Sequence, residues 1–270
     1  MNAYPFFEVE KHVDQQTAVL YLNRPEKLNA MNWPFWRDLP LVAEDLENDP
    51  EIRVVVIAGR GKSFSVGIDA FEFFVNNQDA LTGATPEFRE KLHALIIQMQ
   101  QGFNRMAQGN KIYIGAVHRH CIGGALDLIA ACDLRVASRD AVFSLRETKI
   151  AIVADMGSLN RLPLIIGQGH TRMLALTGRD FPADAALRMG LVNELYENQE
   201  ELMKGALMLA AEIAANPGNA VRGTKKVLHY MENHSVEDGL KYVATWNSAF
   251  FNTGEVQTAF QRSMESKKKG

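Results

Sequence analysis

The chain has 270 residues, 47% of them hydrophobic, and a net charge of −3 at pH 7. This is enough apolar material for one large domain with a sizeable core, and the acidic balance argues against a nucleic-acid binder. No apolar run approaches the roughly 20 residues of a membrane span, and we see no secretory signal. Cys121 and Cys132 lie in or beside one apolar run and indicate reduced core thiols. We therefore expect a cytoplasmic protein.

Strands and helices alternate through the first half of the chain. Asn32 is the expected cap of a helix that ends near Asn48, just before a proline. From Thr85 to about Ala107 apolar residues recur at helical spacing, and we expect this stripe to pack in the core. The apolar runs predict strands over residues 7–11, 17–22, 52–58, 112–117, 133–137 and 141–145.

After Gly157 the sequence predicts helices only. One is expected over about residues 199–215, and a capping box at Ser235 starts another. We therefore predict an α/β core over residues 1–197 and a helical C-terminal segment over residues 198–270.

Three carboxylates, Asp127, Glu147 and Asp155, stand in otherwise apolar, glycine-punctuated sequence. An ionised carboxylate in such surroundings costs several kcal/mol unless it is paired, hydrogen-bonded or neutralised. The chain either pairs these groups structurally or uses them, and Asp155 alone can also be explained as a helix cap. If the three converge, burial and mutual repulsion push their pKa values apart, so that one can act as a base and another as an acid.

Several short motifs, in their order and spacing, resemble the crotonase (enoyl-CoA hydratase/isomerase) superfamily from about residue 7 to the end. The resemblance implies a spiral of ββα units with a C-terminal helical segment that packs homotrimers, often paired into hexamers. The motifs are Asn23-Arg-Pro-Glu-Lys-Leu-Asn-Ala-Met31, Gly61-Lys-Ser-Phe-Ser-Val-Gly-Ile-Asp69, Cys121-Ile-Gly-Gly-Ala-Leu-Asp127, Ala131-Cys-Asp-Leu-Arg135 and Gly157-Ser-Leu-Asn-Arg-Leu-Pro163.

The resemblance also implies where an acyl-CoA thioester substrate binds. The backbone N–H groups of Ile68 and Gly124 match an oxyanion hole for the thioester oxygen, and Gly124 opens a predicted helix whose N-terminal dipole favours an anion. Lys27, Lys62 and Arg24 lie in loops where the family binds CoA, although each alone also fits a solvated surface charge. Lys27 and Lys62 are the preferred pair, because they fall in matched motifs. We expect no metal site and no cofactor, because CoA is part of the substrate.

Within the family, the set of acids is most similar to that of the Δ3,5-Δ2,4-dienoyl-CoA isomerases. Hydratases carry glutamates at the positions of Asp127 and Glu147, and usually glycine at that of Asp155. Shifting two double bonds requires removal of a proton at C2 and delivery of one at C6, which suits two separate acid/base groups. We expect Asp155 to act at C2 and Glu147 at C6, with Asp127 orienting or tuning Glu147; the reverse order of the first two roles stays open.

Two other functions stay open. A 2-enoyl-CoA hydratase or another crotonase lyase would use Asp127 and Glu147 as its working pair. A non-catalytic acyl-CoA-binding or RNA-binding member is the third possibility. The chain also departs from the family at Arg119, where members usually have glycine, and a bulky residue there is expected to alter the turn that leads into Gly124.

Overall fold

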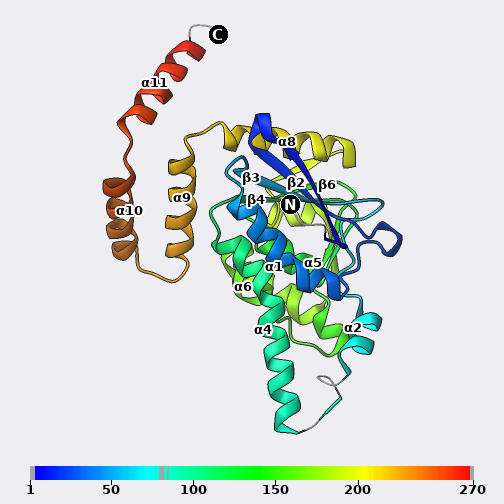
Figure 1. The fold of residues 1–270 in the computed structure, drawn as a ribbon. Coiled ribbons are helices and arrows are strands. Elements are labelled where there is room, and N and C mark those ends of the chain that lie inside the picture. Colours follow the sequence, from blue (N-terminus) through cyan, green and yellow to red (C-terminus); the bar gives the residue numbers. More distant parts are fainter. Residues whose placement is uncertain (1–3, 79–81, 84, 268–270) are drawn as a thin grey trace.

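The computed structural model describes residues 4–78, 82–83 and 85–267, which fold into a six-stranded and a three-stranded sheet surrounded by helices (Figure 1). In the large sheet only the first pair of strands is antiparallel. The large sheet has the order β1 (Phe7–His12), β2 (Thr17–Leu22), β3 (Val54–Gly59), β4 (Ile112–Val117), β6 (Leu134–Ser138), β9 (Glu194–Tyr196). The small sheet has the order β5 (His120–Ile122), β7 (Val142–Ser144), β8 (Asp180–Pro182).

Successive strand pairs contribute one strand to each sheet and are followed by a helix. β4 continues into β5 and then α5 (Gly124–Ala130), while β6 continues into β7 and, through a 3-10 turn η3 (Glu147–Ile150), into α6 (Ser158–Thr177). This arrangement confirms the predicted α/β fold built from ββα units. It also brings the ends of β5 and β7 side by side, because these two strands pair in parallel.

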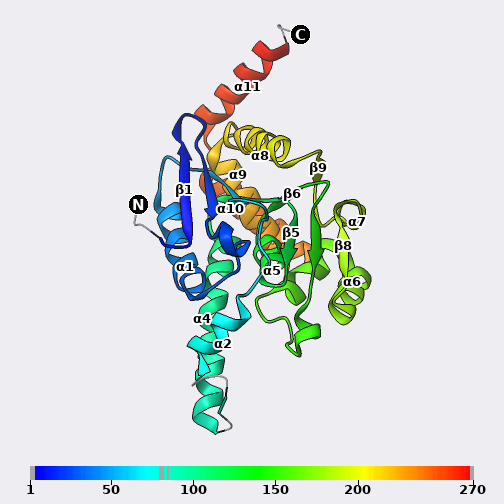
Figure 2. The same cartoon turned by 90° about the vertical axis from the view of Figure 1, so that its right-hand side faces the viewer.

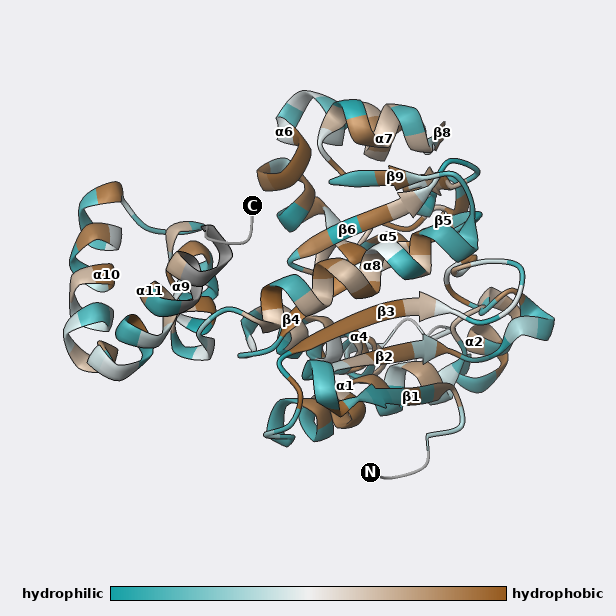
Figure 3. Ribbon diagram, turned by 90° about the horizontal axis from the view of Figure 1, so that it is seen from above, coloured by the Kyte–Doolittle hydropathy of each residue, from teal (hydrophilic) through white to brown (hydrophobic). Residues whose placement is uncertain are grey.

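Both faces of the large sheet are covered, which explains why its central strands are apolar throughout (Figure 3). Side chains alternate between the faces. Val55 and Ile57 belong to the cluster formed with α1 (Trp33–Asn48) and α4 (Pro86–Gln108), and Val54 and Val56 pack with α8 (Gln199–Ala214).

Two expectations about the elements are wrong in part. The chain after Gly157 is not entirely helical, because β8 and β9 lie there; strands of three residues are too short to show an alternating pattern. The apolar stripe of α4 is buried only toward its C-terminal end, at Met99, Phe103 and Met106. The N-terminal end of α4 extends beyond the body of the molecule (Figures 1 and 2).

The C-terminal helices differ in their relation to the body. α8 packs on the sheet, whereas α9 (Gly218–Met231), α10 (Val236–Phe250) and α11 (Thr253–Lys267) stand beside it (Figures 1 and 3). The division at residues 197 and 198 stays a prediction, since α8 belongs with the sheet by its packing. Lys225 ties α9 to the body, because its buried Nζ donates to the carbonyl oxygens of Met106 and Lys111 and pairs with Asp133 at 2.9 Å.

Cys121 and Cys132 are buried free thiols, as the sequence predicts. Among the described helices, none combines the length and the apolar character needed to cross a membrane.

Candidate active site

The three predicted carboxylates come together from three elements. Asp127 lies in the first turn of α5, Glu147 begins η3 shortly after the end of β7, and Asp155 precedes α6. Asp155 and Asp127 both lie close enough to Glu147 for their charges to raise its pKa. The fold therefore brings the three acids together, which the sequence alone could state only as a condition.

Asp127 is the most deeply buried of the three, with a residue exposure of 1%. Its Oδ1 accepts a hydrogen bond of 2.6 Å from the backbone N–H of Ser158. Burial raises the pKa of Asp127 to about 6, even though Ser158 and Arg161 act in the opposite direction. A carboxylate that holds its charge in such a setting makes it harder for a neighbouring acid to ionise.

Glu147 has an environment that favours its protonated form. Burial first, and then repulsion by Asp127, raise the pKa of Glu147 to about 7. Its Oε2 is buried without a hydrogen-bond partner in the described part of the chain. Its Oε1 would lie 3.0 Å from a β-carbon at residue 123, so Gly123 leaves room for the carboxyl group. With a pKa near neutrality, Glu147 can either donate or accept a proton at pH 7.

Asp155 is half-buried, and burial raises its pKa. The structure does not support the alternative of a helix cap, because the N-cap of α6 is Gly157 and no side chain caps it. The backbone carbonyl of Asp155 accepts a 2.6 Å hydrogen bond from Gln100 of α4, which fixes the backbone there. The side-chain carboxylate of Asp155 does not cap α6 and is available for another role.

The two predicted oxyanion donors lie on adjoining backbone segments. Gly67 has φ of +84°, and a β-carbon there would lie 2.4 Å from the carbonyl oxygen of Ile122, so only glycine permits this approach. The close approach places the Ile68 segment beside the start of α5. Among the described residues, the Ile68 N–H has no acceptor, and the Gly124 N–H has none within α5 because it stands in the first turn.

Arg119 stands in the turn between β4 and β5. It adopts φ of +60°, in the left-handed region. Its carbonyl oxygen accepts from the N–H of Val142, and the following residues pair β5 with β7 in register. This backbone conformation costs a residue with a β-carbon about 1–2 kcal/mol, and the expected alteration of the turn relative to glycine stays a prediction.

The loops that carry Lys27 and Lys62 are joined to each other. The buried Asn29 donates to the carbonyl oxygens of Arg60, Ser63 and Phe64 at 2.9, 2.8 and 3.1 Å. Both lysines are exposed on the connected loops and available to an anionic ligand.

Arg24 differs from these two lysines. Its guanidinium donates to Asp69 at 2.7 Å and to Glu72 at 3.1 Å, which ties the loop to the start of α2 (Ala70–Asn76). These contacts make Arg24 a weaker candidate for CoA binding than Lys27 or Lys62.

Sequence reasoning missed residues that support the acids. Ser158 and Arg161 lie in a quoted motif, but nothing in the spacing shows that the first turn of α6 meets Asp127. In the described residues no group of three or more His, Cys, Asp or Glu side chains is arranged to hold a metal ion.

Comparison with known proteins decides the family. The family model for enoyl-CoA hydratase/isomerase matches residues 12–270. The chain belongs to this family. A relative from Arabidopsis thaliana, named peroxisomal Delta(3,5)-Delta(2,4)-dienoyl-CoA isomerase, is 38% identical over 99% of this chain and 97% of its own length. The mitochondrial isomerase of that name from Homo sapiens is 39% identical over 97% of this chain and 80% of its own.

These names contradict the expectation of a cytoplasmic protein, because they place the relatives in peroxisomes or mitochondria. The expectation rested on the lack of a recognisable secretory signal, and the lack of that signal does not bear on import into peroxisomes or mitochondria.

Solved structures of crotonases share the fold. A putative enoyl-CoA hydratase from Streptomyces coelicolor superposes with a TM-score of 0.87 at 26% identity, covering 97% of this chain and 94% of that one. A putative enoyl-CoA hydratase from Thermobifida fusca, solved in complex with CoA, gives 0.79 at 27% identity over 90% of this chain and 92% of its own.

Proposed function

We propose that this member of the family isomerises 3,5-dienoyl-CoA to 2,4-dienoyl-CoA. The observation that carries the proposal is the third acid, Asp155, which lies close enough to Asp127 and Glu147 for its charge to raise the pKa of both. Hydration across one double bond needs only a pair of acids, whereas a shift of two double bonds uses proton transfer at two distant carbons. The names of the relatives from plants and humans agree with this activity.

In the proposed mechanism, the thioester oxygen binds between the N–H groups of Ile68 and Gly124. Removal of a proton from C2 by Asp155 places negative charge on that oxygen, and each donor stabilises it by about 2.7–4 kcal/mol. The electrons move along the chain and C6 accepts a proton from Glu147. Burial and repulsion, which keep Glu147 protonated near neutral pH, suit it to the role of the acid.

The CoA part of the substrate provides charged groups that the protein can bind. CoA carries phosphates, and Lys27 and Lys62 lie exposed on two loops that Asn29 joins. The proposal includes no cofactor, because every proton moves between the substrate and a side chain. The CoA complex of the relative from Thermobifida fusca supports an acyl-CoA ligand for this fold.

The test is an ultraviolet time course of the purified protein with a 3,5-dienoyl-CoA, run in parallel with a 2-enoyl-CoA. We expect growth of the conjugated 2,4-dienoyl thioester band, and a loss of about 10²–10⁴-fold in rate for Asp155→Asn. Asp14→Asn, at an exposed site in the first 3-10 turn, is the matched control. Loss of the enoyl band without isomerisation would instead identify a hydratase that uses Asp127 and Glu147, and inactivity on both would favour a non-catalytic member.

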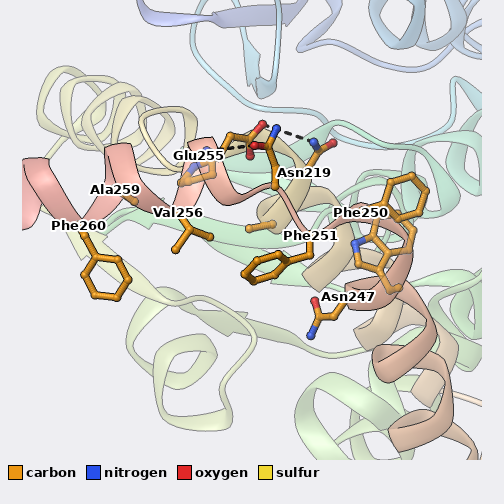
Figure 4. A pocket seen from close by; sticks show the side chains of 12 residues that line it. Asn219, Asn247, Phe250, Phe251, Glu255, Val256, Ala259 and Phe260 are labelled. Atoms are coloured by element: carbon orange, nitrogen blue, oxygen red, sulfur yellow. Dashed lines mark hydrogen bonds between the residues drawn. The ribbon is translucent and has the colours of Figure 1, made fainter.

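We infer that the helices α9 to α11 form the contact between copies in a homotrimer or hexamer. A cavity of about 370 Å³ lies between them, lined by Phe250, Phe251, Val256 and Phe260, and Asn219 reaches Glu255 across it (Figure 4). These helices also expose several large apolar side chains, and apolar surface gathered on neighbouring elements commonly marks a protein contact. They are Leu228, Val236, Leu240, Phe251, Phe260 and Met264.

Analytical ultracentrifugation tests this inference. The wild-type protein is expected to sediment as a trimer or a hexamer, and Leu240→Glu to reduce the assembly. A wild-type protein that stays monomeric at micromolar concentration would contradict the inference.

A further inference from the structure

A polar cavity of about 300 Å³ lies away from the three acids, where the body of the protein joins the C-terminal helices. Its walls are formed by the residues before β3 and β4, the end of α8 and the first turn of α9. Because these strands run parallel, their N-terminal ends share one edge of the large sheet, whereas the loops with Lys27 and Lys62 follow the C-terminal ends of β2 and β3. The cavity therefore has no part in the proposed reaction.

Two half-buried cations line the cavity at this edge of the sheet. Arg53 Nη1 donates to the carbonyl oxygens of Ala214 and Asn216 at 3.1 and 3.2 Å. Lys111 Nζ donates to two backbone carbonyl oxygens at 2.6 Å each. Neither cation forms an ion pair with a carboxylate of the described residues, so these contacts position both charges without neutralising them.

A third cation, Arg222, reaches the cavity from α9. Its Nη2 donates to Asn219 at 2.8 Å, and its guanidinium lies 5.9 Å from the centre of the Trp246 ring. Its Nε is buried and has no hydrogen-bond partner in the described part of the chain. A buried donor of this kind costs free energy until an acceptor binds to it. The first turn of α9, which no side chain caps, lines the cavity as well.

The carboxylates around the cavity do not balance these three charges. Among the described lining residues, Glu255 is the one carboxylate, and it accepts a 3.5 Å hydrogen bond from Asn219 (Figure 4). Asp49 pairs with Lys11 at 2.5 Å, outside the cavity lining. Glu47 accepts two backbone N–H groups at 2.7 and 3.1 Å. The cavity therefore carries a net positive charge.

We propose that this cavity binds a small phosphate-bearing anion, held by Arg53, Lys111 and Arg222. A guanidinium group presents paired N–H donors that match two oxygens of one phosphate group, and an ammonium group adds a compact charge. The peptide N–H groups in the first turn of α9 favour the same ligand. At about 30 Å³ for one water molecule, a cavity of about 300 Å³ has room for more than one tetrahedral group. Diphosphate therefore fits it better than phosphate.

The bound anion joins two parts of the chain. Arg53 and Lys111 belong to the body, whereas Arg222 belongs to α9. A β-carbon at residue 218 would lie 3.3 Å from Arg53 Cζ, so the guanidinium of the body lies directly at the start of α9. An anion that bridges the three cations stabilises α9 on the body. It binds only when these segments are folded together, and it therefore raises the free energy of unfolding.

Isothermal titration calorimetry tests the proposal with sodium diphosphate, inorganic phosphate and ADP, each in a chloride buffer at one ionic strength. We expect one diphosphate per chain, bound more tightly than phosphate. Arg222→Gln removes a charged contact and should weaken diphosphate binding at least about tenfold. Arg188→Gln, at an exposed site on α7 (Ala183–Met189), should leave the affinity unchanged. Diphosphate should also raise the unfolding temperature of the wild type more than that of Arg222→Gln.

Lys62→Gln distinguishes this site from the loops proposed to bind CoA. Binding that Lys62→Gln weakens and Arg222→Gln does not would place the anion on those loops and overturn the proposal, as would a lack of binding at millimolar diphosphate. If Arg222→Gln does not fold, Arg222→Lys, which keeps the charge but loses the Nε donor, should weaken binding by less, and an unchanged affinity in the folded variant would overturn the proposal. ADP that binds as tightly as diphosphate would identify the ligand as the phosphates of a nucleotide, and weaker ADP binding would identify it as a free anion.

Discussion

Glu147→Gln is expected to stabilise the protein at high pH and to leave its stability nearly unchanged at low pH. The wild-type carboxyl group is buried and its Oε2 has no hydrogen-bond partner in the described chain. When it ionises, no cation of the described residues compensates the charge, which faces Asp127. Glutamine has nearly the same shape and carries no charge at any pH, so the substitution removes this cost.

The magnitude follows from the pKa. The pKa of Glu147 rises from its ordinary 4.5 to about 7 in the folded protein, and each pH unit of such a rise corresponds to about 1.4 kcal/mol. Below pH 4.5 both states are protonated and the group costs nothing. As pH rises toward 7, the unfolded state ionises first and wild-type stability falls by about 3 kcal/mol in total.

Urea unfolding at pH 5 and pH 8, at one protein concentration, measures this difference. Glu147→Gln should exceed the wild type by about 3 kcal/mol at pH 8 and by less than about 1 kcal/mol at pH 5. Glu212→Gln, at an exposed position of α8, is the control and should stay within about 0.5 kcal/mol at both values. An equal gain at the two pH values would refute the reasoning, because it would show that the carboxyl group is not perturbed by burial.

Two further predictions concern the scaffold. Lys225→Met breaks the buried pair with Asp133 and should lower the free energy of unfolding, measured in urea, by about 3–5 kcal/mol. The control Lys226→Met loses one exposed hydrogen bond and should cost less than about 1 kcal/mol. Similar losses in the two variants would show that the buried pair contributes no more than an exposed hydrogen bond. Arg119→Gly should raise the free energy of unfolding by up to about 1 kcal/mol, because the relieved left-handed strain exceeds the added freedom of the unfolded chain. A destabilised Arg119→Gly protein would mean that the arginine side chain contributes more than its backbone costs.

The sequence predicts the elements best where burial is uniform. β2 and β4 have the bounds that their apolar runs indicate, and Ser235 caps α10 as the capping box requires. The half-exposed end of α4 shows the limit of such patterns: a helical stripe indicates which face is apolar, but not how far the body of the protein extends beside it.

The candidate site depends on relations that no local pattern contains. The three acids Asp127, Glu147 and Asp155 are separated by 20 and 8 positions in the sequence. Whether they meet depends on how the strands before them pair, which the sequence does not show. The contact of Ser158 with Asp127 could not be predicted, because Asp127 lies on another element. The sequence favours Lys27 and Lys62 over Arg24 for CoA binding, and the two carboxylate partners of Arg24 supply a physical reason for the same order.

The small sheet has a consequence for how the protein opens. Glu147 follows β7, and α5 with Asp127 follows β5, so both acids depend on a three-stranded sheet of short strands. Cooperative units of this size can open while the rest of a protein stays folded. Opening of β5, β7 and β8 would disperse the acids while the six-stranded sheet remained intact. Bound substrate would therefore slow amide hydrogen exchange in the small sheet more than in β2 and β3, which makes exchange a direct readout of site assembly.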